Sequence, residues 1–130
     1  MDPRVTRVID LMEERLDTPV SLTDFAAAVN LSPSRMARVF KQHTGKPPAR
    51  YLHDLRLARA RVLLERTYLS VKQVMVCVGL HDPSHFSRDF RRAHGFSPSH
   101  LRQRSWAADT LSHARPFEPD APTGNGNNGS

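Results

Sequence analysis

Apolar residues recur along this chain every three or four positions, the spacing that puts them on one face of an α-helix, and no strand alternation appears. Serine, aspartate or proline precedes most of these series, as is usual where helices start. Ser21 with Asp24 and Ser70 with Gln73 also have the spacing of capping boxes. The pattern predicts an all-α fold of about seven helices, with helix starts near Pro3, Ser21, Ser32, Pro48, Ser70, Asp82 and Pro98.

Two stretches of the chain repeat each other. Residues 21–31 match residues 70–80 at an offset of 49, and the match resumes from Pro33 to Pro48 at an offset of 50. The extra residue falls in a turn, where an insertion costs least. Each copy is therefore a helix, a short turn and a second helix, which is the arrangement of a helix-turn-helix. In that motif the second helix enters the DNA major groove and contacts bases near its N-terminus.

The second helix of each copy has an outward side that helical spacing identifies. Met36 and Phe40 mark the buried stripe of the first copy, so the residues opposite or beside it are Ser34, Arg35, Ala37, Arg38 and Lys41. Phe86 and Phe90 do the same in the second copy, where the outward residues are Ser84, His85, Ser87, Arg88 and Arg91. Arginine pairs well with guanine and serine with several bases, so we expect the early residues to contact bases. Lys41, Arg91 and Arg92 come later in their helices, where phosphate contact is expected.

The charge of the chain favours a polyanionic partner. Its formal net charge is +6 at pH 7, and 16 of its 19 basic residues are arginine, which suits bidentate contacts with phosphate or guanine. Residues 1–104 carry a net charge of +8, whereas residues 105–130 carry −2. Double-stranded DNA is the partner that this distribution and the repeated motif together predict.

Four segments follow from these patterns. We expect a first helix-turn-helix subdomain over residues 1–47, a linker helix over 48–66, a second subdomain over 67–106 and a disordered tail over 107–130. The tail is rich in Gly, Asn and Pro and cannot bury enough apolar surface to offset its ordering entropy. The linker helix would be about 28 Å long, compatible with two reading helices about 34 Å apart on one face of DNA. Its apolar register is expected to include Tyr51, Leu55, Ala58 and Val62.

Other chemistry is weakly represented. The single cysteine, Cys77, lies in an apolar run and is expected to be a buried structural thiol. His81 and His85 have a spacing that zinc can use, but they straddle a helix start and lack a third ligand nearby. Neither a nucleophile elbow nor a glycine-rich phosphate loop occurs. The sequence therefore predicts no enzyme, no metal and no cofactor, and a cytoplasmic, nucleoid-associated protein without a membrane span or signal peptide.

Over roughly Val5 to Arg104 the chain resembles the DNA-binding domain of AraC/XylS-type bacterial transcription regulators. The second copy and its lead-in carry the most specific motifs, which are Arg56–Leu64, Val78–Leu80, Phe86–Arg92 and Gly95–Pro98. The first copy matches at Leu31–Ser32, Met36, Arg38, Phe40–Lys41, Gly45, Pro48 and Tyr51. The resemblance implies two helix-turn-helix subdomains joined by a long helix, binding adjacent major-groove segments of a promoter.

The resemblance also assigns roles to particular positions. It implies that bases are read at Ser34, Ala37 and Arg38 in the first copy and at Pro83, Ser84, His85 and Arg88 in the second. Ala37 and Pro83 depart from the polar residues often found there, although alanine can pack on a thymine methyl group. Three other departures from the usual family residues are expected on the core side, at Met75, Leu80 and Leu101. They alter packing but remove no side chain that would contact a base.

Three interpretations of the function remain open at this point. Relatives usually activate transcription by contacting RNA polymerase, and a chain whose first helix follows Met1 so closely resembles the minority of single-domain members, which bind DNA as monomers. An alternative is an interaction module that binds RNA polymerase or another regulator, with weak DNA binding; its association with that partner would be insensitive to Arg38 and Arg88. A basic membrane-surface helix is a third interpretation, but no helix here joins a broad apolar face to a wholly basic one.

Overall fold

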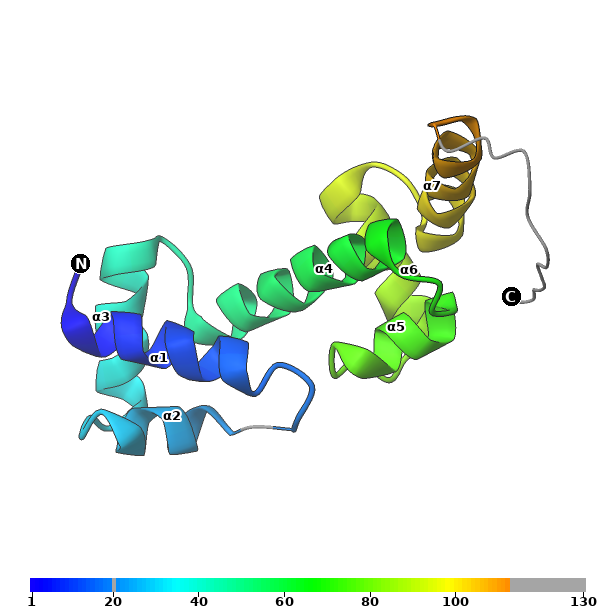
Figure 1. Cartoon of the computed structure of the whole chain (residues 1–130). Coiled ribbons are helices and arrows are strands. Elements are labelled where there is room, and N and C mark those ends of the chain that lie inside the picture. The colour runs from blue at the N-terminus through cyan, green and yellow to red at the C-terminus, as the bar shows by residue number, and fades with distance from the viewer. Residues whose placement is uncertain (20, 113–130) are drawn as a thin grey trace. The chain divides into compact units, whose positions relative to one another are not determined.

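The computed structural model describes residues 1–19 and 21–112, with side chains as far as Ser105. Every regular element in that part of the chain is a helix (Figure 1), which confirms the predicted all-α class. The seven helices are α1 (Pro3–Glu14), α2 (Leu22–Ala28), α3 (Pro33–Thr44), α4 (Pro48–Arg66), α5 (Val71–Cys77), α6 (Pro83–His94) and α7 (Pro98–Ser112).

The chain forms two compact units, which we call unit 1 (Met1–Arg56) and unit 2 (from Leu57 onward). Their boundary falls inside α4, so this helix contributes residues to both hydrophobic cores. Leu52 of α4 belongs to the core of unit 1, whereas Leu57, Ala60 and Leu64 belong to that of unit 2. Each unit contains one copy of the sequence repeat.

The core of unit 1 is formed by α1, α2, α3 and the first half of α4. Phe25 and Phe40 are fully buried, and the ring of Phe40 meets that of Tyr51 edge-on with centroids 5.2 Å apart. The remaining buried residues of this core include Val5, Val8, Leu11, Met12, Leu16, Ala26, Val29, Met36 and Leu52. Such burial of large apolar side chains is the main favourable term in the folding of so small a unit.

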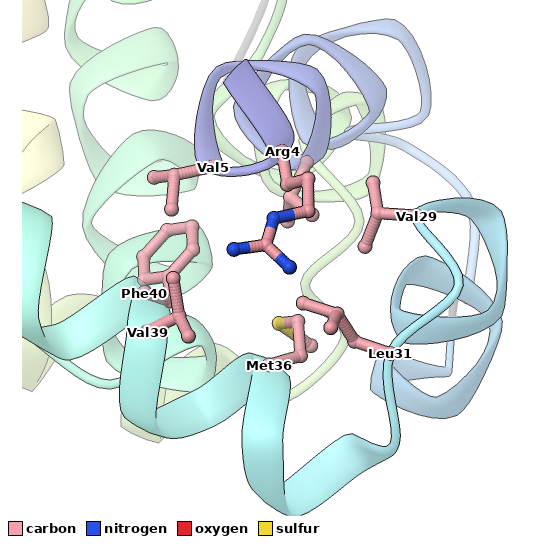
Figure 2. A pocket seen from close by; sticks show the side chains of 8 residues that line it. Arg4, Val5, Val29, Leu31, Met36, Val39 and Phe40 are labelled. Carbon is pink, nitrogen blue, oxygen red and sulfur yellow. The ribbon is translucent and has the colours of Figure 1, made fainter. Parts of the chain in front are cut away.

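Arg4 is one of the residues that line a mostly apolar pocket in unit 1. Figure 2 shows its side chain pointing from α1 toward α3 and the turn before it, with Leu31, Met36 and Phe40 among the residues around it. Its guanidinium pairs with the Asp2 carboxylate at 2.9 Å, and Asp2 also caps α1 by accepting from the backbone N–H of Arg4. These hydrogen bonds lower the pKa of Asp2 to about 2. The aliphatic stem of Arg4 thus shields core residues while its charge stays near solvent.

Unit 2 buries a smaller core between the second half of α4 and helices α5, α6 and α7. Phe90 is fully buried, and its ring lies 5.7 Å from that of Phe86 and 4.5 Å from that of His94, measured between centroids. The other buried residues are Leu57, Ala60, Leu64, Val74, Met75, Val78 and Leu101. Met75 and Leu101 therefore lie on the core side, as expected.

An arginine in each unit holds the loop that leads into the helix-turn-helix. Arg56 of α4 donates to the carbonyl oxygens of Leu16 at 3.1 Å and Thr18 at 3.2 Å. Arg102 of α7 is 6% exposed and donates to the carbonyl oxygens of Thr67 and Leu69. Burial lowers the pKa of both guanidinium groups. Thr18 and Thr67 each lie three residues before a copy of the repeat, at the same offset of 49, so the two arginines secure corresponding loops.

Three local predictions are wrong in detail. Ser21 caps α2 by accepting from the N–H of Thr23, but no capping box forms with Asp24, because the shorter aspartate replaces the Glu or Gln of that motif. The expected stripe on α4 stops after Leu55: Ala58 is exposed and Val62 is 43% exposed, since each unit draws its own set of residues from this helix. Cys77 is exposed rather than buried, because α5 turns only Val74, Met75 and Val78 of that apolar run inward.

The last helix is longer than expected. Helix α7 extends to Ser112, so residues 107–112 are helical, although the disordered tail was expected to begin at 107. Ala107, Ala108 and Leu111 have high helix propensity, and no proline interrupts the chain before Pro116, so the sequence allows the helix to continue past residue 106. The rest of the expected tail, residues 113–130, lies outside the described residues.

Candidate nucleic-acid interface

Helices α3 and α6 are built alike. Each has 12 residues, begins with proline after a capping side chain, and ends at a glycine with positive φ. The Ser32 hydroxyl accepts from the N–H of Arg35 at 3.2 Å, and the Asp82 carboxylate accepts from the N–H of His85 at 3.1 Å. The expected starts and ends of both helices are thereby confirmed. Because both helices have defined starts and ends, the register of their outward residues is also defined.

The turns that precede these helices have the same geometry. Asn30 and Gly79, which match in the repeat, both have positive φ, of 59° and 80°. Glycine and asparagine are the residues that adopt this left-handed conformation most readily. Each turn therefore redirects the chain sharply from α2 into α3 and from α5 into α6, which is the connection that a helix-turn-helix requires.

The outward residues of α3 and α6 are placed as the spacing predicts. In α3 the exposed ones are Ser34, Arg35, Arg38 and Lys41, and Ala37 is half-buried. In α6 the exposed ones are Pro83, Ser84, His85, Ser87, Arg88, Arg91 and Arg92. Met36, Phe40, Phe86 and Phe90 are buried on the opposite sides, as expected. Contact of the outward residues with DNA stays a prediction.

The two outward surfaces differ in their electrostatics. In α6, Nδ1 of His85 lies 3.2 Å from a carboxylate oxygen of Asp82, and Nε of Arg88 lies 3.5 Å from one of Asp89. Hydrogen bonding from the His85 N–H, helped by the nearby His85 and Arg88 side chains, lowers the pKa of Asp82. In α3, neither Arg35 nor Arg38 has a carboxylate within 4.0 Å in the part of the chain that the structure describes. The sequence pattern predicts Asp82 only as a helix cap, so this difference was not expected from it.

A further basic residue lies beside α6. An open groove of about 600 Å³ runs between α5 and α6, lined by Ser70, Val71, Lys72, Met75, Pro83, Phe86 and Ser87. Lys72 is exposed and shares this groove with Ser87, an outward residue of α6. Lys72 was not predicted from the repeat, because its match in the first copy is the uncharged Thr23. Lys72 therefore adds one basic side chain on α5 to the basic side chains exposed on α6.

Other kinds of site are not apparent in the described chain. Among residues 1–19 and 21–112, no three His, Cys, Asp or Glu side chains gather in a way that could hold a metal ion. Within the same ranges, no helix combines the length and the apolar character needed to cross a membrane.

Two capped helix-turn-helix motifs, each with outward arginine and serine, define a DNA-binding type of domain, and comparison with known proteins identifies its family. A family model described as a helix-turn-helix domain matches residues 25–104. The transcriptional regulator GbdR of Pseudomonas aeruginosa is 36% identical over 101 residues, which cover 78% of this chain and 28% of that protein. The transcriptional activator RhaS of Escherichia fergusonii is 40% identical over 102 residues, covering 78% of this chain and 37% of that protein.

Solved structures agree with these sequence matches. An AraC-type DNA-binding regulator from Chromobacterium violaceum has a TM-score of 0.75 and 35% identity, over 79% of this chain and 92% of that one. The DNA-binding domain of AdpA, solved with a target DNA, has a TM-score of 0.74 and 28% identity, over 86% of this chain and 97% of that one. The chain belongs to the AraC-type helix-turn-helix family of transcription regulators. It spans only about a third of the length of the curated relatives.

Proposed function

We propose that this chain binds double-stranded DNA sequence-specifically and regulates transcription, with α3 and α6 as its two recognition helices. One observation carries the proposal: equivalent positions of two capped helices present exposed serine and arginine, Ser34 with Arg38 and Ser84 with Arg88. Arginine and serine are suited to base edges in the major groove. Duplex DNA repeats its groove each helical turn, so two similar reading helices can bind adjacent segments.

The residues of the two helices divide into two roles. Those that contact bases are Ser34, Arg35, Ala37 and Arg38 in α3 and Pro83, Ser84, His85 and Arg88 in α6. Those that contact phosphates are Lys41, Arg91 and Arg92, which lie toward the C-terminal ends of their helices. Base contacts determine which sequence is bound, whereas phosphate contacts set the register and most of the salt dependence.

The mode of action follows from the arrangement along the chain. Both reading helices belong to one chain in the same N-to-C order and differ in their outward residues, so the chain binds an asymmetric site as a monomer. Helix α4 is the linker between the two subdomains. We place the protein on the bacterial nucleoid, as an activator that contacts RNA polymerase; the support for activation is that one relative, RhaS, is a transcriptional activator.

Selection from random duplex DNA with the pure protein tests the proposal. The expected result is a directional, bipartite motif whose half-sites lie about one helical turn apart, without an inverted repeat. Inserting five base pairs between the half-sites should prevent α3 and α6 from binding both half-sites at once, because one half-site then faces the other side of the duplex. Absence of any enriched motif would contradict sequence-specific binding and favour the interaction module instead.

Substitutions then test the assigned roles. Arg38→Ala and Arg88→Ala should each weaken specific binding by about 1–3 kcal/mol and relax preference in different half-sites. Lys41→Ala or Arg91→Ala should weaken binding to all sequences alike and reduce the salt slope by about one unit each. Titrations on the selected site and on a scrambled site measure both effects. Tight, selective binding by both the Arg38 and Arg88 variants would show that the assigned base-contacting positions are wrong.

A further inference from the structure

The two recognition helices share their outward serine and arginine, Ser34 with Arg38 and Ser84 with Arg88, but differ at several neighbouring positions. Ser32, Arg35 and Val39 of the first copy correspond to Asp82, His85 and Asp89 of the second. The second copy therefore carries two carboxylates where the first has a hydroxyl and an isopropyl group. These differences fall at the helix start and beside Arg88, within the surface proposed to contact DNA.

The Asp82 carboxylate has more contacts than a helix cap needs. One of its oxygens accepts from the backbone N–H of His85 at 3.1 Å, and the other lies 3.2 Å from Nδ1 of the His85 ring. In the first copy, the Ser32 hydroxyl accepts only from the N–H of Arg35, at 3.2 Å. Serine, asparagine and aspartate cap helices about equally well. An uncharged side chain could therefore cap α6, and capping alone does not require the negative charge of Asp82.

The position of this charge affects how α6 meets DNA. The Asp82 side chain is 56% exposed, adjoins His85, and lies near enough to Arg88 for that cation to favour its ionised form. A carboxylate this close to Arg88 weakens the attraction of α6 for phosphates, which is the part of DNA binding that does not depend on sequence. Arg35 and Arg38 of α3 have no such carboxylate within 4.0 Å among the described residues.

We infer that Asp82 is a specificity-determining residue of the second recognition helix, acting in two ways through its carboxylate. The carboxylate orients the His85 ring toward the bases. It also repels the DNA phosphates, which lowers the affinity for every duplex, and only a duplex whose bases make favourable contacts with α6 recovers that loss. Discrimination by an unfavourable contact is a common way to reject wrong partners. Unit 1 then supplies more of the sequence-independent attraction, and unit 2 more of the selectivity. This inference rests on the proposed function.

The test is neutralisation of Asp82 with the cap retained. Asp82→Asn should tighten binding to a scrambled duplex by about fivefold, equivalent to about 1 kcal/mol, because one repulsive charge is removed. Binding to the selected site should gain less or weaken, so the ratio of the two Kd values falls by about fivefold or more. Asp82→Ser introduces the residue type that caps α3 and should give the same result. It provides a second neutral variant in case the asparagine variant misfolds.

Asp10→Asn is the matched control, because Asp10 is exposed on α1, outside both helix-turn-helix motifs, and its loss changes net charge equally. This control should shift both Kd values alike and leave their ratio unchanged. If the Asp82 variants also leave the ratio unchanged while the parent discriminates, the inference is overturned and the proposed function stands. If the parent binds both duplexes equally, the proposed function fails and this inference with it.

Discussion

Replacing Arg102 by methionine tests how the second helix-turn-helix is held in place. The Arg102 side chain is 6% exposed and donates from Nη1 to the Thr67 carbonyl and from Nη2 to the Leu69 carbonyl. Both carbonyls belong to the loop that ends at Ser70, the cap of α5. Methionine has a similar length and apolar character but cannot donate, so the substitution removes both hydrogen bonds with little loss of packing.

The expected cost can be worked out from these two bonds. A hydrogen bond from a charged donor contributes about 1.5–3 kcal/mol, so two contribute about 3–6 kcal/mol. Burial of the guanidinium opposes this gain, as the lowered pKa of Arg102 indicates, and methionine avoids that penalty. The net loss in the free energy of unfolding should be about 2–4 kcal/mol, a large share of the stability of a small domain.

Thermal and urea unfolding followed by circular dichroism provide the measurement. A loss of about 2 kcal/mol should lower Tm by roughly 8 °C or more. Arg102→Lys should be intermediate, since an ammonium group lacks the fork that reaches both carbonyls. Arg56→Met, which removes the corresponding contacts to Leu16 and Thr18, is the matched variant of unit 1. If Arg102→Met unfolds within about 2 °C of the parent, the assigned role of Arg102 is refuted.

Three further substitutions have expected outcomes. Phe90→Ala should cost about 3–5 kcal/mol in urea unfolding, because it empties the centre of the unit 2 core. Gly45→Ala should cost about 1 kcal/mol in the same assay: φ is 84° there, yet no atom lies within 4 Å of the added Cβ, so only backbone strain is introduced. Cys77→Ser should change stability by less than about 0.5 kcal/mol, and the parent thiol should react with a maleimide in the folded state, because Cys77 is exposed.

Helix ends were predictable because their signals are local. Ser32 with Pro33 and Asp82 with Pro83 each need only the next few backbone groups to start a helix, and Gly45 and Gly95 need only a free φ to end one. The capping box of Ser70 and Gln73 is likewise confirmed by the structure. No tertiary information enters these contacts. The same local spacing also located the buried and outward sides of the two recognition helices.

The failures concern choices that only the tertiary structure makes. A run of apolar residues in a short helix cannot all face one core, and neighbours decide that Val74 turns inward while Cys77 does not. A helix shared by two cores does not keep one apolar stripe, which is why Val62 lies outside the expected register. The contacts of Arg102 were missed because its partners are 33 and 35 residues away in the sequence.

Comparison of the two copies separates residues that maintain the fold from residues that distinguish the two reading surfaces. Positions that maintain the fold of each unit keep the same residue type. Phe40 is buried in the core of unit 1 and Phe90 in that of unit 2, and Gly45 ends α3 as Gly95 ends α6. Positions around the reading surface differ between the copies instead; one example is the helix cap, which is Ser32 in the first copy and Asp82 in the second. If divergence there were only drift, exchanging the two caps would leave selectivity unchanged. Because Asp82 contacts His85 beyond its capping role, we expect selectivity to follow the charge.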